Sequence, residues 1–357
     1  MIASIRIMPA MRAWPSASYR HWNRGGAAMT EQSHSESQAQ PEVLLRVDKL
    51  RKRIRGRWII DDVSFEVRAG EIFGFLGPNG AGKTTTIRML VDLIRPTSGS
   101  VQVCGRDVRR EPEQALEQIG CIVENPEVYP YLTGRENLAF AARMLRGIGA
   151  ARIDEVVRLV GMTQRIDDKV RTYSLGMRQR LGIAMALLGK PRLLILDEPT
   201  NGLDPKGIKE LRAFVRMLAG QGMGVFISSH LLSEIQLMCD RVAIIGAGRV
   251  LTTGAVHELT ADAPSYVVWQ LQDREAGLRL LEREPQAEIL GPDAADVLED
   301  TALAAAPGAI VTTMPPELVA PLVARMTEAG IGVDAVQPVM PTLESLFLKL
   351  TEGEGIV

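Results

Sequence analysis

The chain has 357 residues, of which 46% are hydrophobic and 24% are charged, and its formal net charge is −2. That length accommodates one large domain and a smaller one, with enough apolar residues for a sizeable core. The near-neutral balance excludes a protein that binds nucleic acid through its overall charge. No apolar run reaches the roughly 18 residues that a membrane-spanning helix requires, so we expect membrane contact only through a partner. Three widely spaced cysteines favour unpaired thiols in a reducing cytosol.

Residues 1–41 are predicted to form a disordered N-terminal extension. The first 28 residues contain four arginines and no acidic residue, a composition that is similar to a transit peptide. Met29 then opens a polar segment that is typical of disorder. We interpret residues 1–28 as upstream codons or a flexible tail, with the working protein starting near Met29.

Ordered elements are predicted from residue 42 onward. Alternating runs at 43–50 and 62–70 indicate two strands joined by a basic hairpin. An apolar strand at 71–77 leads through a glycine-rich turn into a helix at 83–94.

The middle of the chain combines helices with buried strands. Apolar positions three and four apart predict mainly helices over 110–180. Continuous apolar runs at 192–200 and 224–230 indicate parallel strands that are covered on both faces, and 241–254 favours a closing hairpin. Together these patterns predict an α/β domain over 42–258.

The sequence after residue 258 predicts a small α+β accessory domain over 259–357, without a chemical motif of its own. Its predicted strands are 265–271, 308–313 and 332–339, and its predicted helices are 315–330 and 342–350. The first of these helices is amphipathic. Its apolar face consists of Leu318, Leu322, Val323 and Met326.

Residues 77–85 form the strongest chemical motif. Their sequence, GPNGAGKTT, fits the phosphate-loop pattern G-x-x-x-x-G-K-[ST] between a strand and a helix. Glycines let backbone N–H groups turn around phosphate oxygens, and the helix directs its positive end at the same anion. We expect Lys83 to reach the β- and γ-phosphates of a nucleotide and Thr84 to bind Mg²⁺. The candidate ATP-binding residues in this loop are Gly77, Pro78, Asn79, Gly80, Ala81, Gly82, Lys83, Thr84 and Thr85.

Two acidic residues, Asp197 and Glu198, follow the apolar run LLIL. An acidic pair at a strand end is more often surface charge, but a phosphate loop upstream favours a catalytic interpretation. Asp197 would bind Mg²⁺ through its water shell, and Glu198 would act as the general base that takes a proton from the attacking water.

With these motifs, residues 43–255 resemble the ATP-binding subunit of ABC transporters. The resemblance implies a phosphate-loop NTPase core with an antiparallel β subdomain and a helical subdomain at about 125–180. The stretch YSLGMRQR (173–180) resembles the family's signature, whose usual form is LSGGQ. Ser174 and Gly176 are kept, so the resemblance makes them ATP-binding candidates. The departures from the usual form are Tyr173, Leu175 and Met177.

The resemblance also implies further site residues, cofactors and partners. Asp204 lies in NGLDP, which resembles the family's D-loop, and His230 stands at its switch histidine, which contacts the γ-phosphate. In this family two subunits sandwich two ATP molecules, so we expect a homodimer. It would hydrolyse ATP to ADP and phosphate with Mg²⁺ and drive a separate integral-membrane permease. The expected location is cytoplasmic, at the inner face of the cell membrane.

Glu124 follows the run GCIV at the position where the family's Q-loop usually has glutamine. A carboxylate keeps the reach of glutamine but adds negative charge, which a divalent cation tolerates and a bare phosphate repels. We therefore hypothesise that Glu124 is a catalytic residue and Mg²⁺ ligand that makes site closure more dependent on Mg²⁺. The alternative is a solvated loop carboxylate.

Phrases around Glu124 and the signature resemble the bacitracin-resistance and lantibiotic-immunity exporters, as does PTLESLFLKLTEG at 341–353. Export of a peptide antibiotic or a similar amphipathic compound is therefore expected, with export of a small drug or lipid as the nearest alternative. A soluble ABC ATPase of DNA repair or translation would carry two cassettes, zinc modules or a coiled coil, which the sequence does not show. Glu198 argues against an ATP sensor that only binds, and the exporter phrases argue against import. Two residues are candidates for the contact with the adenine ring: an apolar contact by Ile54 is favoured, and stacking by Trp58 is the alternative.

Overall fold

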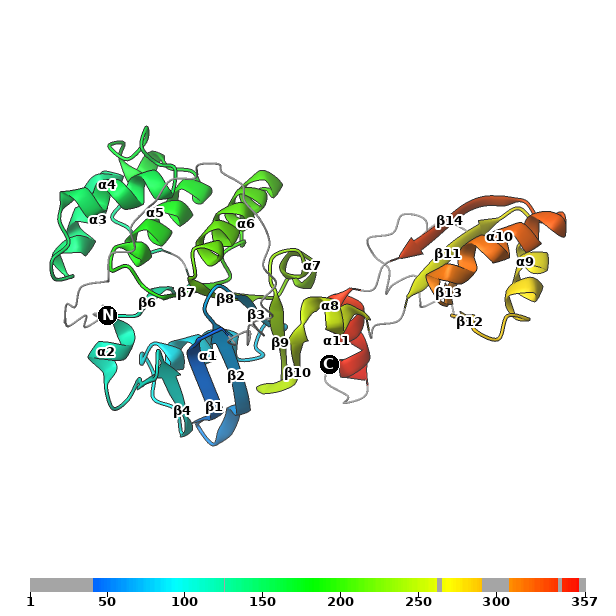
Figure 1. Cartoon of the computed structure of the whole chain (residues 1–357), viewed down its shortest axis with the longest axis horizontal. Coiled ribbons are helices and arrows are strands. Elements are labelled where there is room, and N and C mark those ends of the chain that lie inside the picture. The colour runs from blue at the N-terminus through cyan, green and yellow to red at the C-terminus, as the bar shows by residue number, and fades with distance from the viewer. Residues whose placement is uncertain (1–40, 125, 262–264, 291–307, 340–341, 353–357) are drawn as a thin grey trace, which may run out of the picture. The chain divides into compact units, whose positions relative to one another are not determined.

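The computed structural model describes residues 41–124, 126–261, 265–290, 308–339 and 342–352 (Figure 1). The extension predicted to be disordered lies outside these residues, apart from residue 41. The chain forms two compact units. The first contains the described residues up to Phe75, Asn79–Ser229 and Ala247–Val250, and the second contains Leu76–Pro78, His230–Gly246 and the described residues from Leu251 onward.

An antiparallel sheet opens the first unit, with strands in the order β2-β1-β4-β5. The predicted hairpin is confirmed, but its strands run further into the basic segment, because the turn is only two residues long. Arg55 and Gly56 both have positive φ, as a tight turn between right-twisted strands requires. The strands are β1 (Val43–Ile54), β2 (Arg57–Arg68), β4 (Ser98–Val103) and β5 (Arg106–Asp107).

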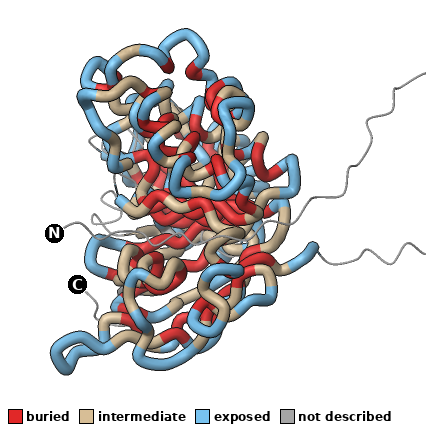
Figure 2. The backbone as a smooth tube through the Cα atoms, turned by 90° about the vertical axis from the view of Figure 1, so that its left-hand side faces the viewer, coloured by how far each residue is buried: buried red, intermediate tan, exposed pale blue. Residues whose placement is uncertain are grey.

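Four further strands of the first unit are neighbours in the order β3-β8-β7-β6. The pairs β6–β7 and β7–β8 are parallel, and every residue of β3, β7 and β8 is buried, as the continuous apolar runs predicted. Such buried stretches are red in Figure 2. Phe65 stacks at a centroid distance of 5.3 Å on Phe73 and of 5.6 Å on Phe226. The strands are β3 (Ile72–Leu76), β6 (Ile119–Ile122), β7 (Leu193–Asp197) and β8 (Gly224–Ser229).

The helices of the first unit include the predicted helix after the phosphate loop, although it ends at Leu90 rather than residue 94. Asp92 has a φ of 56° and Pro96 follows, so the helical backbone cannot continue. The segment 110–180 is mainly helical, with α3, α4 and α5 close together in Figure 1, but it also contains the short strand β6. The helices are α1 (Lys83–Leu90), α2 (Pro112–Leu116), α3 (Gly134–Arg143), α4 (Ala150–Leu159), a 3₁₀ turn (Val170–Thr172), α5 (Leu175–Leu187) and α6 (Pro205–Gly220).

The predicted hairpin β9–β10 lies mostly in the second unit, which also contains a sheet in the order β12-β13-β11-β14. Every strand and helix predicted for the accessory domain is present, but helix α9 and strand β12 were not predicted. The strands are β9 (Arg241–Gly246), β10 (Arg249–Ala255), β11 (Tyr266–Leu271), β12 (Glu288–Ile289), β13 (Ile310–Thr313) and β14 (Val333–Val339). The helices are α7 (Leu232–Gln236), α8 (Val256–Ala261), α9 (Arg274–Leu281), a 3₁₀ turn (Pro316–Leu318), α10 (Val319–Glu328) and α11 (Leu343–Glu352).

A separate apolar core holds the accessory sheet to α9 and α10. Trp269, Leu281, Leu322 and Met326 are completely buried in this core, and Leu318 and Val323 pack against it, which confirms the predicted helix face. The last helix, α11, contacts α7 and α8 of the same unit, and the Leu343 N–H donates to Gln236 Oε1 at 2.9 Å. None of the described helices is long and apolar enough to cross a bilayer.

Candidate functional site

The phosphate loop connects β3 to α1 in the way the motif predicted. Gly80 and Gly82 have φ values of 84° and 104°, which L side chains rarely adopt. A Cβ at Gly82 would lie 2.3 Å from Ile60 Cδ1, so the loop also approaches β2 closely at this glycine. Gly82 is the N-cap of α1 and Lys83 is its first residue, which leaves the first N–H groups of the helix to face an anion.

Lys83 lies beside the predicted general base. Its side chain is only 6% exposed, and its Nζ is 3.2 Å from Glu198 Oε1. The Glu198 side chain is 16% exposed, so the pair is largely shielded from water. The sequence predicted a role for each residue separately, and the structure brings the two into direct contact.

The carboxylate of Asp197, at the end of β7, is 2% exposed and has two different environments. Its Oδ1 accepts a hydrogen bond of 2.5 Å from Ser228 Oγ. Its Oδ2 is buried and has no hydrogen-bond partner among the described residues. Because an unpaired buried carboxylate oxygen is costly, this atom is suited to a cation.

The donor set around Asp197 fits Mg²⁺ rather than a metal held by protein alone. Asp197 supplies a buried carboxylate oxygen, and Thr84, in the first turn of α1, supplies a hydroxyl. The part of the chain that the structure describes has no cluster of three or more His, Cys, Asp or Glu that could hold a metal. Mg²⁺ is usually bound by one or two oxygen groups of the protein and completes its shell with substrate phosphates and water.

Ser174 and Asp204 cap two helices that open on one hollow. Ser174 Oγ accepts from Met177 N at 3.3 Å before α5, and Asp204 Oδ1 accepts from Gly207 N at 2.9 Å before α6. Both residues and Gly176 line a hollow of about 390 Å³. Two helix N-termini at one hollow favour an anionic ligand there.

Leu175, which replaces a glycine of the usual signature, packs against the segment that resembles the D-loop. A Cβ at Gly202 would lie 2.7 Å from Leu175 Cδ2, and Gly202 has a φ of 72°. The larger residue in the signature is therefore accommodated by a glycine in the neighbouring loop.

Glu124 is not bonded to the group formed by Lys83, Asp197 and Glu198. Its side chain is 59% exposed and forms an ion pair with Arg88 of α1, and its φ is 62°. Its predicted roles as Mg²⁺ ligand and catalytic residue therefore stay predictions.

The remaining candidates lie at the ends of strands. His230 directly follows β8 and is half-buried. Ile54 and Trp58, the candidates for the adenine contact, are 43% and 47% exposed beside the turn of the β1–β2 hairpin. The Arg53 guanidinium carbon lies 5.7 Å from the centre of the Trp58 ring, which is within cation–π distance.

Sequence reasoning missed Ser228 and Arg88. Ser228 is the first serine of SSH, where only the histidine was considered, and the register of β7 on β8 places it opposite Asp197. That pairing could have been anticipated from two adjacent parallel strands that both end in polar residues.

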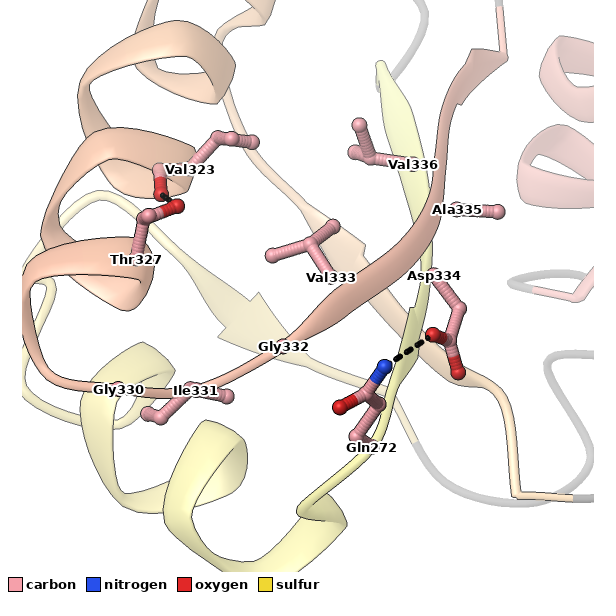
Figure 3. A pocket seen from close by; sticks show the side chains of 10 residues that line it. All are labelled: Gln272, Val323, Thr327, Gly330, Ile331, Gly332, Val333, Asp334, Ala335 and Val336. Atoms are coloured by element: carbon pink, nitrogen blue, oxygen red, sulfur yellow. Dashed lines mark hydrogen bonds between the residues drawn. The ribbon is translucent and has the colours of Figure 1, made fainter.

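A second hollow, of about 600 Å³, lies in the accessory domain between α10 and β14 (Figure 3). Its polar groups largely satisfy one another, since Gln272 Nε2 donates to Asp334 Oδ1 at 2.9 Å and Thr327 Oγ1 to the Val323 carbonyl at 2.8 Å. The carboxylate in this hollow, Asp334, is exposed and paired with Gln272, unlike the buried Asp197.

Comparison with known proteins agrees with this geometry. The family model of the ABC transporter matches residues 60–201. The uncharacterized ABC transporter ATP-binding protein YhcH of Bacillus subtilis (strain 168) is 45% identical over 311 residues, which are 87% of this chain and 96% of YhcH. The chain belongs to the ATP-binding proteins of the ABC transporter family.

Further members of this family are similar in sequence and in structure. The bacitracin transport ATP-binding protein BcrA of Bacillus licheniformis is 44% identical, over 67% of this chain and 79% of BcrA. A solved structure of the ATP-binding subunit of an ABC transporter has a TM-score of 0.56 and 32% identity, over 61% of this chain and 92% of that one. The predicted fold and the resemblance to the drug-export group are thus confirmed. ABC ATP-binding proteins bind and hydrolyse ATP, and those of exporters work with a membrane permease.

Proposed function

We propose that this chain is the ATPase subunit of an exporter, and that Mg-ATP is hydrolysed where the phosphate loop meets the ends of β7 and β8. The observation that carries the proposal is the grouping of Lys83, Asp197 and Glu198. A shielded ammonium lies 3.2 Å from Glu198, and the neighbouring Asp197 has a buried carboxylate oxygen without a partner among the described residues.

Each of these residues has a distinct role in the proposed reaction. Lys83 has three N–H donors, so it can hold phosphate oxygens and still stay close to Glu198. Glu198 takes the proton of the attacking water. Asp197, through Oδ2, and Thr84, through its hydroxyl, would hold Mg²⁺, which when bound would neutralise charge on the phosphates.

Two copies of the chain are proposed to share each nucleotide. The hollow beside Ser174, Gly176 and Asp204 would receive the phosphates of the ATP bound to the other copy, because two helix N-termini favour an anion there. His230 would contact the γ-phosphate in its own subunit. ATP then favours the closed dimer, and hydrolysis removes that preference.

The proposed cargo is a peptide antibiotic or a similar amphipathic compound, carried by a separate permease that holds the subunit at the cytoplasmic face of the membrane. The similarity to BcrA, a bacitracin transport protein, supports this cargo class. A small drug or a lipid is the alternative cargo.

Susceptibility of cells to antibiotics tests the cargo. The chain would be expressed together with its membrane permease in a sensitive strain, with Glu198→Gln as the matched inactive control. We expect protection against bacitracin or related peptides with the wild type only. Protection against small drugs but not against peptides would favour the alternative cargo. No protection against any compound would contradict export.

A further inference from the structure

We propose that Ser228 is a positioning residue that orients the Asp197 carboxylate for Mg²⁺ and holds the backbone of Glu198. The inference rests on the proposed function, which makes these two acidic residues the metal ligand and the base. It concerns a completely buried residue that acts through its neighbours.

The first contact of Ser228 fixes which oxygen of Asp197 is available. Strand register places the two residues opposite each other at the ends of β7 and β8, and Ser228 is completely buried. Its Oγ donates to Asp197 Oδ1 at 2.5 Å. Oδ1 is therefore occupied, and Oδ2 is left as the oxygen that can reach a cation.

The second contact reaches the predicted base. The Glu198 N–H points at Ser228 and donates to its Oγ at 3.1 Å and to its carbonyl oxygen at 3.2 Å. Since the N–H is the donor in this contact, the only hydroxyl proton of Ser228 is free to be given to Asp197. The direction of both hydrogen bonds is thus determined by chemistry.

The Glu198 backbone needs this support because its φ is 48°, in the left-handed region that is unfavourable for a residue with a Cβ. The fork formed by the Ser228 hydroxyl and carbonyl holds it there. If the hydroxyl is removed, the carbonyl still accepts from Glu198 N, so the greater loss falls on Asp197.

A purely structural hydroxyl and a positioning hydroxyl predict different results. A structural role would lower stability and weaken all nucleotide binding in proportion. A positioning role would weaken only the part of binding that depends on Mg²⁺, because Asp197 could then rotate. Residues that orient metal ligands typically contribute 10–100-fold to metal affinity or activity.

The test measures the binding of a fluorescent, non-hydrolysable ATP analogue to the full chain, in EDTA and over a Mg²⁺ titration. For Ser228→Ala we expect the Mg²⁺ concentration at half-maximal effect to rise about 10-fold or more, while affinity in EDTA is unchanged. Ser228→Cys keeps a weak donor of similar size, so an intermediate rise is expected, and this variant also serves if the alanine variant does not fold.

Thr312→Val is the matched control, because it removes another completely buried strand hydroxyl, in the accessory domain. We expect it to lower the melting temperature without changing the Mg²⁺ titration. An unchanged Mg²⁺ titration in both Ser228 variants would overturn the positioning role. If the wild type itself showed no Mg²⁺-dependent binding, the proposed function would fail instead, so the two failures are distinguishable.

Discussion

The end of β7 and the accessory domain bury polar groups in opposite ways. In the accessory domain Trp269 Nε1 donates to Thr312 Oγ1 at 3.0 Å, and Thr312 donates on to the Val267 carbonyl at 3.3 Å. At the end of β7 one oxygen of Asp197 is buried without a partner among the described residues. A buried polar group that proteins leave unpaired usually has a function, so this difference marks one region as a ligand site and the other as a scaffold.

Two ion pairs allow the comparison to be tested with matched variants. Lys83 and Glu198 are 3.2 Å apart and Glu198 is 16% exposed, whereas Arg325 and Glu284 are 2.8 Å apart and Glu284 is 15% exposed. We expect Glu198→Gln to lower the ATPase rate by about 10²–10⁴-fold, as for the loss of a general base, with ATP still bound. Glu284→Gln should leave the rate unchanged. Steady-state phosphate release measures both, and equal effects of the two variants would refute the assignment of the base.

The core of the accessory domain provides the next test. Trp269 is completely buried, so Trp269→Ala should cost about 3–5 kcal/mol of that domain's stability. The ATPase rate should be retained, since the catalytic residues belong to the other region. Urea unfolding followed by circular dichroism and ATPase assays checks this, with exposed Trp58 changed to alanine as the control that should barely affect stability. Loss of turnover in parallel with unfolding of the accessory domain would mean that it is more than a scaffold.

Substitution of the exposed Glu124 tests whether the ligand site extends to this residue. The negative charge of Glu124 should repel bare ATP and favour Mg-ATP, and glutamine removes that charge. Glu124→Gln should therefore lower several-fold the affinity for ATP in Mg²⁺ divided by the affinity for ATP in EDTA. Arg88→Gln breaks the same ion pair but keeps the carboxylate, so that ratio should not fall. A ratio that is identical in wild type and Glu124→Gln would show that Glu124 is a solvated loop carboxylate.

Much of the fold and part of the site could be predicted from sequence because the signals are local. Continuous apolar runs predicted β3, β7 and β8, and the spacing of glycines before Lys83 predicted the strand–loop–helix unit. Helix α9 was missed although its signal is present, since Asp273 accepts from Ala276 N as an N-cap.

The contacts within the site could not be predicted in the same way, because they depend on which strands are neighbours. The pairing of Ser228 with Asp197 requires the register of β7 on β8, and the pairing of Lys83 with Glu198 also requires the place of β3 in the same sheet. The ion pair of Glu124 with Arg88 joins a loop to a helix 36 residues earlier, and no local pattern encodes that approach.

The most direct test of the proposed mechanism is the oligomeric state of Glu198→Gln, because this variant should hold ATP without turning it over. Light scattering coupled to size exclusion should find a dimer in saturating Mg-ATP and a monomer in Mg-ADP. Replacing Ser174 by arginine in the same chain should abolish the dimer, since the hollow that accepts the partner's phosphates would be filled. A Glu198→Gln protein that stays monomeric in Mg-ATP, both alone and with its permease, would contradict a nucleotide shared between two copies.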